Sequence, residues 1–113
     1  MLISPQQRVY LALNPVDFRK GIDGLQAICR DILRQNPFSG TVFVFRSKNR
    51  TSVKLLFYDG NGFWLCQKRF SKGKLAFWPD SHEAASTLRH SEVNILLAQG
   101  NPSGCIPANW RNL

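Results

Sequence analysis

The sequence has few acidic residues, few cysteines and no long apolar run. Seven Asp and Glu stand against fifteen Lys and Arg in 113 residues, which gives a formal net charge of +8. The three cysteines, Cys29, Cys66 and Cys105, are odd in number and far apart, a pattern typical of neither a disulfide framework nor a zinc site. No apolar run approaches the roughly 18 residues of a membrane span, and residues 1–7 lack the features of a signal peptide. We therefore expect a cytoplasmic protein with reduced thiols.

The acids that are present are too scattered for the common metal-dependent reactions. A metal-dependent nuclease needs several carboxylates converging on a divalent cation, because Mg²⁺ prefers oxygen ligands. Asp17 and Asp23 are six residues apart and point in different directions on a regular helix, and Asp59 stands in a turn, where aspartate is common. His82 and His90 have no Cys or acid at ligand spacing and are weak evidence for zinc. We expect a protein that is not an enzyme and that needs no metal or other cofactor.

Length and composition predict a single folded domain. Apolar residues make up 43% of the chain and aromatic residues 12%, which is a globular composition. A chain of 113 residues fills one hydrophobic core and is too short for two. We expect the core to cover about residues 8–100 within a single domain over 1–113. The tail over 101–113, with Pro102, Gly104 and Pro107, is predicted to be loosely ordered.

Turn-forming residues divide the chain into short elements. Residues 8–13 read as a strand, and Asp17 can cap a helix whose apolar residues recur at spacings of three and four: Phe18, Ile22, Leu25, Ile28, Ile32 and Leu33. Four strand-like runs follow, over 41–46, 53–58, 63–70 and 74–78. Ser81 and Ser91 can each cap a short helix, the second over 92–99 with Gly100 as its stop. The predicted fold class is α+β, with an N-terminal strand and helix, an antiparallel β-meander of about four strands and C-terminal helices.

The positive charge belongs to the predicted meander. Residues 46–74 hold eight bases against one acid, Asp59, and thus carry +7 of the total charge. A field of this sign attracts polyanions, and nucleic acid is the usual one. The candidate DNA-binding residues are Arg46, Lys48, Arg50, Lys54, Lys68, Arg69, Lys72 and Lys74. The loop from Arg46 to Arg50 is the strongest candidate, because loops are more exposed than strand positions.

Strand alternation divides the meander into two faces. If Tyr58 pairs with Phe63 across the four-residue turn, one face is apolar and forms the core. The other face then mixes bases with aromatic residues, of which Tyr58, Phe63 and Trp78 are candidates for stacking on nucleic-acid bases. The same face could instead dock a protein through its aromatic residues, or a second layer could cover it.

Several ordered blocks resemble one family of small proteins. These blocks are VYLA at 9–12, NPVDFRKGIDGL at 14–25, NPFSG at 36–40, VFVFR at 42–46, KLL at 54–56, DGNGFWL at 59–65, KR at 68–69 and FWP at 77–79. In this order they resemble the small accessory proteins, of the TnpB type and encoded by the second open reading frame, of the insertion-sequence sixty-six transposons. The resemblance covers roughly residues 9–100. The loop over 47–52 departs from it, because this loop is usually richer in Arg and Gly in the family, and the tail after Gly100 departs as well.

The resemblance implies a bacterial mobile element in which a separate, larger DDE transposase carries out DNA recombination. This chain is then expected to assist transposition. Together with the basic meander, this leads us to expect that a basic β-sheet face binds DNA of the element ends, the transposase or both, and that the protein is nucleoid-associated when bound to DNA. The alternative is a protein-interaction module that stabilises or regulates the transposase without contacting DNA. Under this alternative, Arg19, Lys20 and Asp23, or the aromatic sheet face, form the contact surface.

Overall fold

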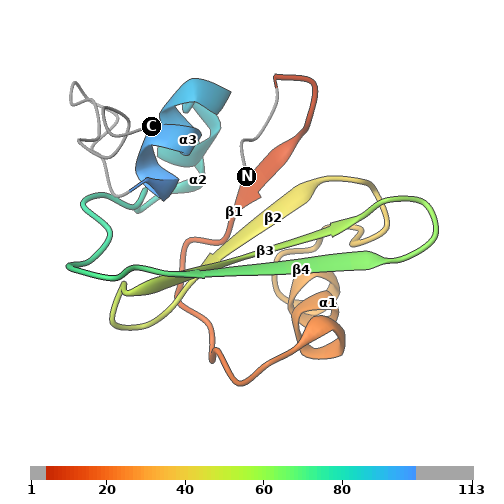
Figure 1. Cartoon of the computed structure of the whole chain (residues 1–113). Coiled ribbons are helices and arrows are strands. Elements are labelled where there is room, and N and C mark those ends of the chain that lie inside the picture. The colour runs from red at the N-terminus through yellow and green to blue at the C-terminus, as the bar shows by residue number, and fades with distance from the viewer. Residues whose placement is uncertain (1–4, 99–113) are drawn as a thin grey trace.

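A four-stranded mixed sheet forms the centre of the protein, for which a computed structural model describes residues 5–98. The strands are β1 (Val9–Leu11), β2 (Val42–Arg46), β3 (Ser52–Tyr58) and β4 (Phe63–Arg69), and they lie side by side in this order (Figure 1). β1 is parallel to β2, whereas β2, β3 and β4 are joined as antiparallel neighbours. The helices are α1 (Ile22–Asp31), α2 (His82–Ser86) and α3 (His90–Leu97). The predicted α+β fold class is confirmed.

Helix α1 covers one face of the sheet. Its buried residues Leu25 and Cys29 pack on Phe43, Phe45 and Leu56, which project from β2 and β3. The helix begins later than Asp17, because Asp17 accepts hydrogen bonds from the backbone and side chain of Arg19 and does not cap a helix. The predicted apolar stripe is only partly used, since Ile32 follows the helix and is 69% exposed.

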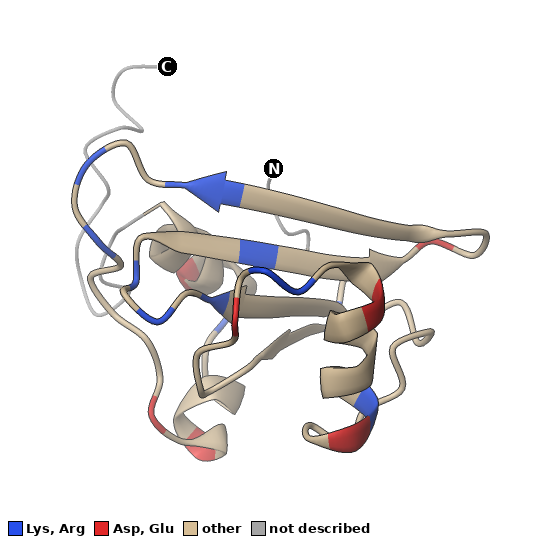
Figure 2. Ribbon diagram, turned by 90° about the horizontal axis from the view of Figure 1, so that it is seen from below, with Lys and Arg blue, Asp and Glu red and all other residues tan. Residues whose placement is uncertain are grey.

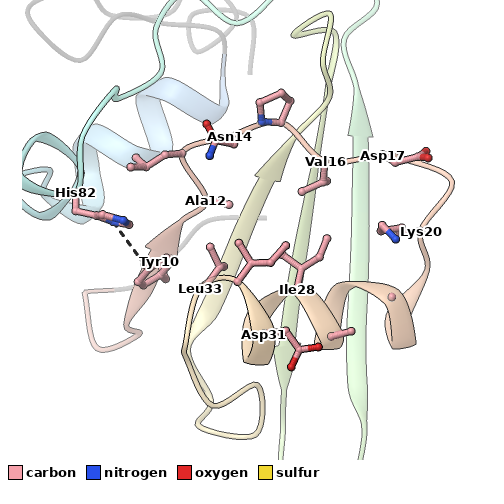
Figure 3. A pocket seen from close by; sticks show the side chains of 15 residues that line it. Tyr10, Ala12, Asn14, Val16, Asp17, Lys20, Ile28, Asp31, Leu33 and His82 are labelled. Carbon is pink, nitrogen blue, oxygen red and sulfur yellow. Dashed lines mark hydrogen bonds between the residues drawn. The ribbon is translucent and has the colours of Figure 1, made fainter.

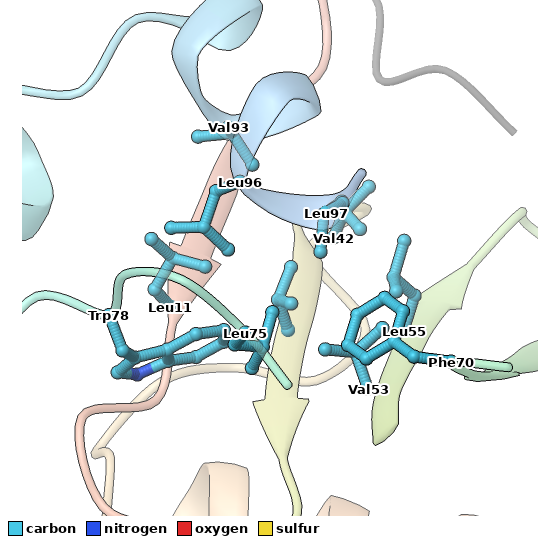
Figure 4. Packing of buried hydrophobic residues seen from close by; sticks show 11 residues of the cluster. Leu11, Val42, Val53, Leu55, Phe70, Leu75, Trp78, Val93, Leu96 and Leu97 are labelled. Carbon is cyan, nitrogen blue, oxygen red and sulfur yellow. The ribbon is translucent and has the colours of Figure 1, made fainter. Parts of the chain in front are cut away.

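The C-terminal part of the chain covers the other face. Residues of β1, β2 and β3 pack there against Leu75, Trp78 and the apolar side of α3, which includes Val93 and Leu96 (Figure 4). Ser81 caps α2 as predicted, since its Oγ accepts a hydrogen bond from the Ala84 amide at 3.0 Å. α3 starts at His90 after Arg89, so the predicted cap at Ser91 is wrong. Gly100 and the predicted tail lie outside the described residues.

The run over 74–78 is not a strand, so the meander has three strands and the sheet's fourth strand is the parallel β1. This run follows the end of β4 as an irregular segment, which the Leu75 amide ties to Arg50 O at 2.9 Å. Trp78 is buried at its end. Within residues 5–98, none of the helices is long and apolar enough to cross a membrane.

Helices lie on both faces of the sheet, and this corrects the prediction of an open aromatic and basic face. The predicted register is confirmed, because Tyr58 pairs with Phe63. The core side is also as predicted for Val53, Leu55 and Phe70. The opposite side is covered by α1, which leaves Leu56 fully buried. The meander can therefore present its charge at its ends and edges and not on a face.

Candidate nucleic-acid interface

Seven bases gather at one end of the sheet, and we call this group the basic end. β2 and β4 both finish there, and the loop between β2 and β3 turns there, because the two outer strands of an antiparallel meander run in the same direction. The segment after β4 stays at this end, since the Phe70 amide donates to Thr51 O and the Leu75 amide to Arg50 O, both at 2.9 Å. Figure 2 shows the Lys and Arg segments gathered there. The basic end consists of Arg46, Lys48, Arg50, Lys68, Arg69, Lys72 and Lys74.

The β2–β3 loop that carries Lys48 and Arg50 is held by its own polar side chains. Ser47 Oγ accepts from the amides of Thr51 and Ser52, both at 3.1 Å, and donates to Asn49 Oδ1 at 2.9 Å. Asn49 Oδ1 also accepts from Thr51 Oγ1 at 2.7 Å. These bonds fix the loop backbone, so Lys48 projects from a turn of defined conformation.

The members of the basic end differ in exposure. Lys48, Lys68, Arg69, Lys72 and Lys74 are exposed, whereas Arg46 and Arg50 are half-buried. Arg46 donates through Nη1 to Ser47 O, and burial lowers the pKa of its guanidinium. Lys68 Nζ donates to Leu97 O at 3.2 Å and lies 5.5 Å from the Phe70 ring centre. The exposed members can approach phosphates without unfolding any element.

Acids are sparse around the basic end. Asp59, the single acid between residues 46 and 74, lies in the β3–β4 turn at the opposite end of the sheet. Asp17 lines a shallow hollow together with Lys48, but its carboxylate is paired with Arg19 at 2.7 Å. The side-chain hydrogen bond from Arg19 is the main cause that holds the pKa of Asp17 well below its ordinary value. The basic end therefore keeps a strong positive field.

Lys54 is not part of this surface, which corrects its place among the predicted DNA contacts. The residue is 5% exposed, and its Nζ donates to Phe18 O and Lys20 O, both at 2.8 Å. Its ammonium group also lies 4.9 Å from the Phe18 ring centre. Lys54 thus fastens the segment before α1 to the sheet, and a phosphate has no access to it.

The predicted stacking residues are also dispersed. Trp78 is buried and donates from Nε1 to Ala12 O at 2.9 Å, so it is a core residue. Tyr58 and Phe63 are half-buried at the turn end of β3 and β4, where Phe38 packs edge-on against both rings. None of the three lies at the basic end. The positive charge and the aromatic rings therefore do not form the mixed platform that the sequence predicted.

The predicted partner-contact residues lie near a groove that the sequence did not reveal. The groove has a volume of about 670 Å³ and runs between α1 and the segment from Tyr10 to Asp17, with an apolar lining that includes Val16, Ile28 and Leu33 (Figure 3). Lys20 lines it as well. Arg19 and Asp23 are exposed, and Arg19 pairs with Asp17 and not with Asp23. The exposed Ile32 also lines the groove, although the helical spacing assigned this residue to the core.

Within residues 5–98, no three His, Cys, Asp or Glu side chains come together in an arrangement that could hold a metal ion. Tyr10 Oη and His82 Nδ1 approach each other to 3.5 Å, and His90 contacts Gln7 O. Both histidines thus have neighbours that explain their positions within the fold.

Fold and charge together define a small α+β protein with a basic end on a covered sheet. Residues 7–103 match the family described as IS66 Orf2 like protein. The chain belongs to this family, and membership supports an accessory role in insertion-sequence transposition. The predicted resemblance is thereby confirmed.

Two curated relatives from Sinorhizobium fredii (strain NBRC 101917 / NGR234) are similar over most of their length. The uncharacterized protein y4jC is 34% identical over 99 residues, which cover 86% of this chain and 84% of the relative. The uncharacterized protein y4hO is 32% identical over 99 residues, which cover 87% of this chain and 85% of the relative. No solved structure matches the chain.

Proposed function

We propose that this protein is a non-catalytic accessory factor of transposition that binds element DNA through the basic end, in the bacterial cytoplasm and next to the DDE transposase. The observation that carries the proposal is the convergence of seven bases from three separate segments on one end of the sheet, away from Asp59. A phosphate backbone is the polyanion that such a surface suits best. Phosphate contacts position a protein and give little sequence preference, so recognition of the element would come mainly from the transposase.

The number of exposed bases sets the expected salt dependence. Each phosphate contact to duplex DNA contributes a slope of about −0.9 to the dependence of log K on log salt. If four of the exposed members of the basic end touch phosphates, the slope is about −3.6, and raising the salt from 50 to 200 mM weakens binding about 150-fold. A slope near zero would contradict the proposal.

Fluorescence anisotropy with labelled terminal-repeat DNA and a scrambled duplex tests the proposal. The double variant Lys48→Glu/Arg69→Glu reverses two exposed charges at the basic end, and we expect the affinity to fall more than tenfold. The matched control is Arg8→Glu/Arg30→Glu, which changes the net charge equally outside the basic end. Equal losses in both variants would show a nonspecific effect of net charge, and no loss in the first would refute the interface.

The apolar groove favours a second candidate function, a module that binds the transposase without DNA. An apolar groove beside an exposed isoleucine is typical of protein contact surfaces and has no use for phosphates. Under this reading, Ile32→Asp should abolish pull-down of the transposase, whereas Lys48→Glu/Arg69→Glu should not. Loss of the complex in the charge variant alone would count against it.

A further inference from the structure

Strand β4 forms an open edge of the sheet. Among the described residues its only strand neighbour is β3, and it pairs with β3 continuously from Phe63 to Arg69 without a bulge (Figure 1). Edge strands are usually protected by proline, by bulges or by charges along their length. β4 has no proline, and its charges are confined to Lys68 and Arg69 at its end. Within residues 5–98, the first five residues of β4, FWLCQ, therefore present a pairing surface without these protections.

The hydrogen-bond ladder shows which backbone groups point outward. Phe70 N donates to Thr51 O at 2.9 Å, and Asp59 N donates to Gly62 O at 3.0 Å. Bonded pairs alternate along an antiparallel ladder, so Trp64, Cys66 and Lys68 also direct their backbone groups toward β3. The N–H and C=O groups of the intervening residues, Phe63, Leu65, Gln67 and Arg69, consequently point away from the sheet.

We propose that this edge pairs with β4 of a second copy of the chain, antiparallel and about a two-fold axis at Cys66. This register pairs all seven residues of the strand. Phe63 is hydrogen-bonded to Arg69 of the partner subunit, and Leu65 to Gln67 of the partner subunit, so every outward backbone group is used. The two Cys66 residues face each other as a pair that shares no backbone hydrogen bond. A two-fold axis makes the interface self-complementary.

Side-chain chemistry supports a second copy over an unrelated strand. Trp64, which is 55% exposed, comes to lie opposite Lys68 of the partner subunit, and Phe63 lies opposite Arg69 of the partner subunit. Aromatic rings and cations attract each other. The two-fold axis forms each of these pairs twice. The antiparallel arrangement also brings each basic end toward the partner's turn end, where Asp59 lies. The two positive ends are thereby kept apart, with the two Arg69 backbones about 20 Å from each other.

Cysteine cross-linking tests this register. Facing residues of a non-bonded antiparallel pair have Cα atoms about 4.5 Å apart, within the range that a disulfide spans. In a Cys105→Ser variant, mild oxidation with copper phenanthroline should produce a covalent dimer through Cys66, because Cys29 is buried. The matched control is Cys66→Ser/Gln67→Cys/Cys105→Ser, which carries the thiol one residue away on the other side of the sheet. Efficient cross-linking at 67 but not at 66 would overturn the register.

Measurement of the mass in solution tests the interface itself. Sedimentation equilibrium should show a species of twice the 12.9 kDa chain mass. Gln67→Pro removes an outward N–H without touching the bonds to β3, so it should shift the species to the monomer, whereas Gln67→Ala should leave the dimer intact. Circular dichroism checks that both variants are folded. If Gln67→Pro does not fold, the cross-linking experiment decides whether the interface exists. If the wild-type chain stays a monomer at every concentration up to the solubility limit, the proposal is overturned. The same monomer is expected if a strand of the transposase, and not a second copy, pairs with the edge.

Discussion

Replacement of Lys54 by methionine separates the structural role of this lysine from a role in DNA binding. Lys54 Nζ donates to Phe18 O and Lys20 O, both at 2.8 Å, and thereby anchors the segment before α1. Methionine has a similar shape but no donor, so both carbonyl groups lose their partner. A buried carbonyl without a partner costs about 1–3 kcal/mol. Lys20 is exposed and Phe18 half-buried, so water replaces part of the loss, and we expect about 2 kcal/mol of destabilisation in total.

Urea denaturation measures this loss as a lower midpoint at an unchanged slope, and thermal unfolding should show a fall in Tm of about 8 °C or more. The control is Lys48→Met, the same substitution at an exposed loop position. It should change stability by less than about 0.5 kcal/mol but weaken DNA binding. The folded Lys54→Met protein should bind DNA like the wild type. An unchanged urea midpoint, or weaker DNA binding by the folded variant, would refute the structural role of Lys54.

Three further predictions concern the β2–β3 loop, the β3–β4 turn and the buried thiol. Arg50 has φ 63°, a left-handed conformation that favours glycine, so Arg50→Gly should raise the urea midpoint slightly while it weakens DNA binding; a lower midpoint would contradict this. A hydrogen bond from the Asn61 amide and, as the second largest cause, one from the Trp64 indole hold the pKa of Asp59 below its ordinary value. The stability due to this carboxylate is therefore fully present above about pH 4 and lost as the pH falls through the lower folded pKa, and Asp59→Asn, which keeps the acceptor oxygen, should flatten this part of a pH series of urea midpoints. Burial raises the pKa of the Cys29 thiol to about 11, so in a Cys66→Ser/Cys105→Ser variant a thiol reagent should react only at the rate of unfolding, and rapid labelling of the folded protein would contradict the burial.

The sequence predicted the strands of the hairpin and their register with good accuracy. Tyr58 and Phe63 flank a turn in which Gly60 has φ 107° and Asp59 Oδ1 accepts from two backbone amides, and strand alternation then places Val53 and Leu55 on the core side. The run over 74–78 has the same alternation, but it leaves β4 through Gly73 and pairs with no strand. Strand propensity alone does not say whether a partner is within reach, so this element was predicted incorrectly.

The candidate site was also predicted only in part from the sequence. The sequence by itself determined that the positive charge lies between residues 46 and 74, because net charge is a sum over residue types, and its ordered blocks determined the family. Only the tertiary structure decided which bases reach the solvent. Lys54 and Trp78 stand in the same alternating pattern as exposed residues. The segment before α1 nevertheless covers Lys54, and the core cluster that includes the apolar side of α3 encloses Trp78. Alternation fixes that neighbours point to opposite faces of a sheet, but whether a face meets water depends on what distant segments pack against it.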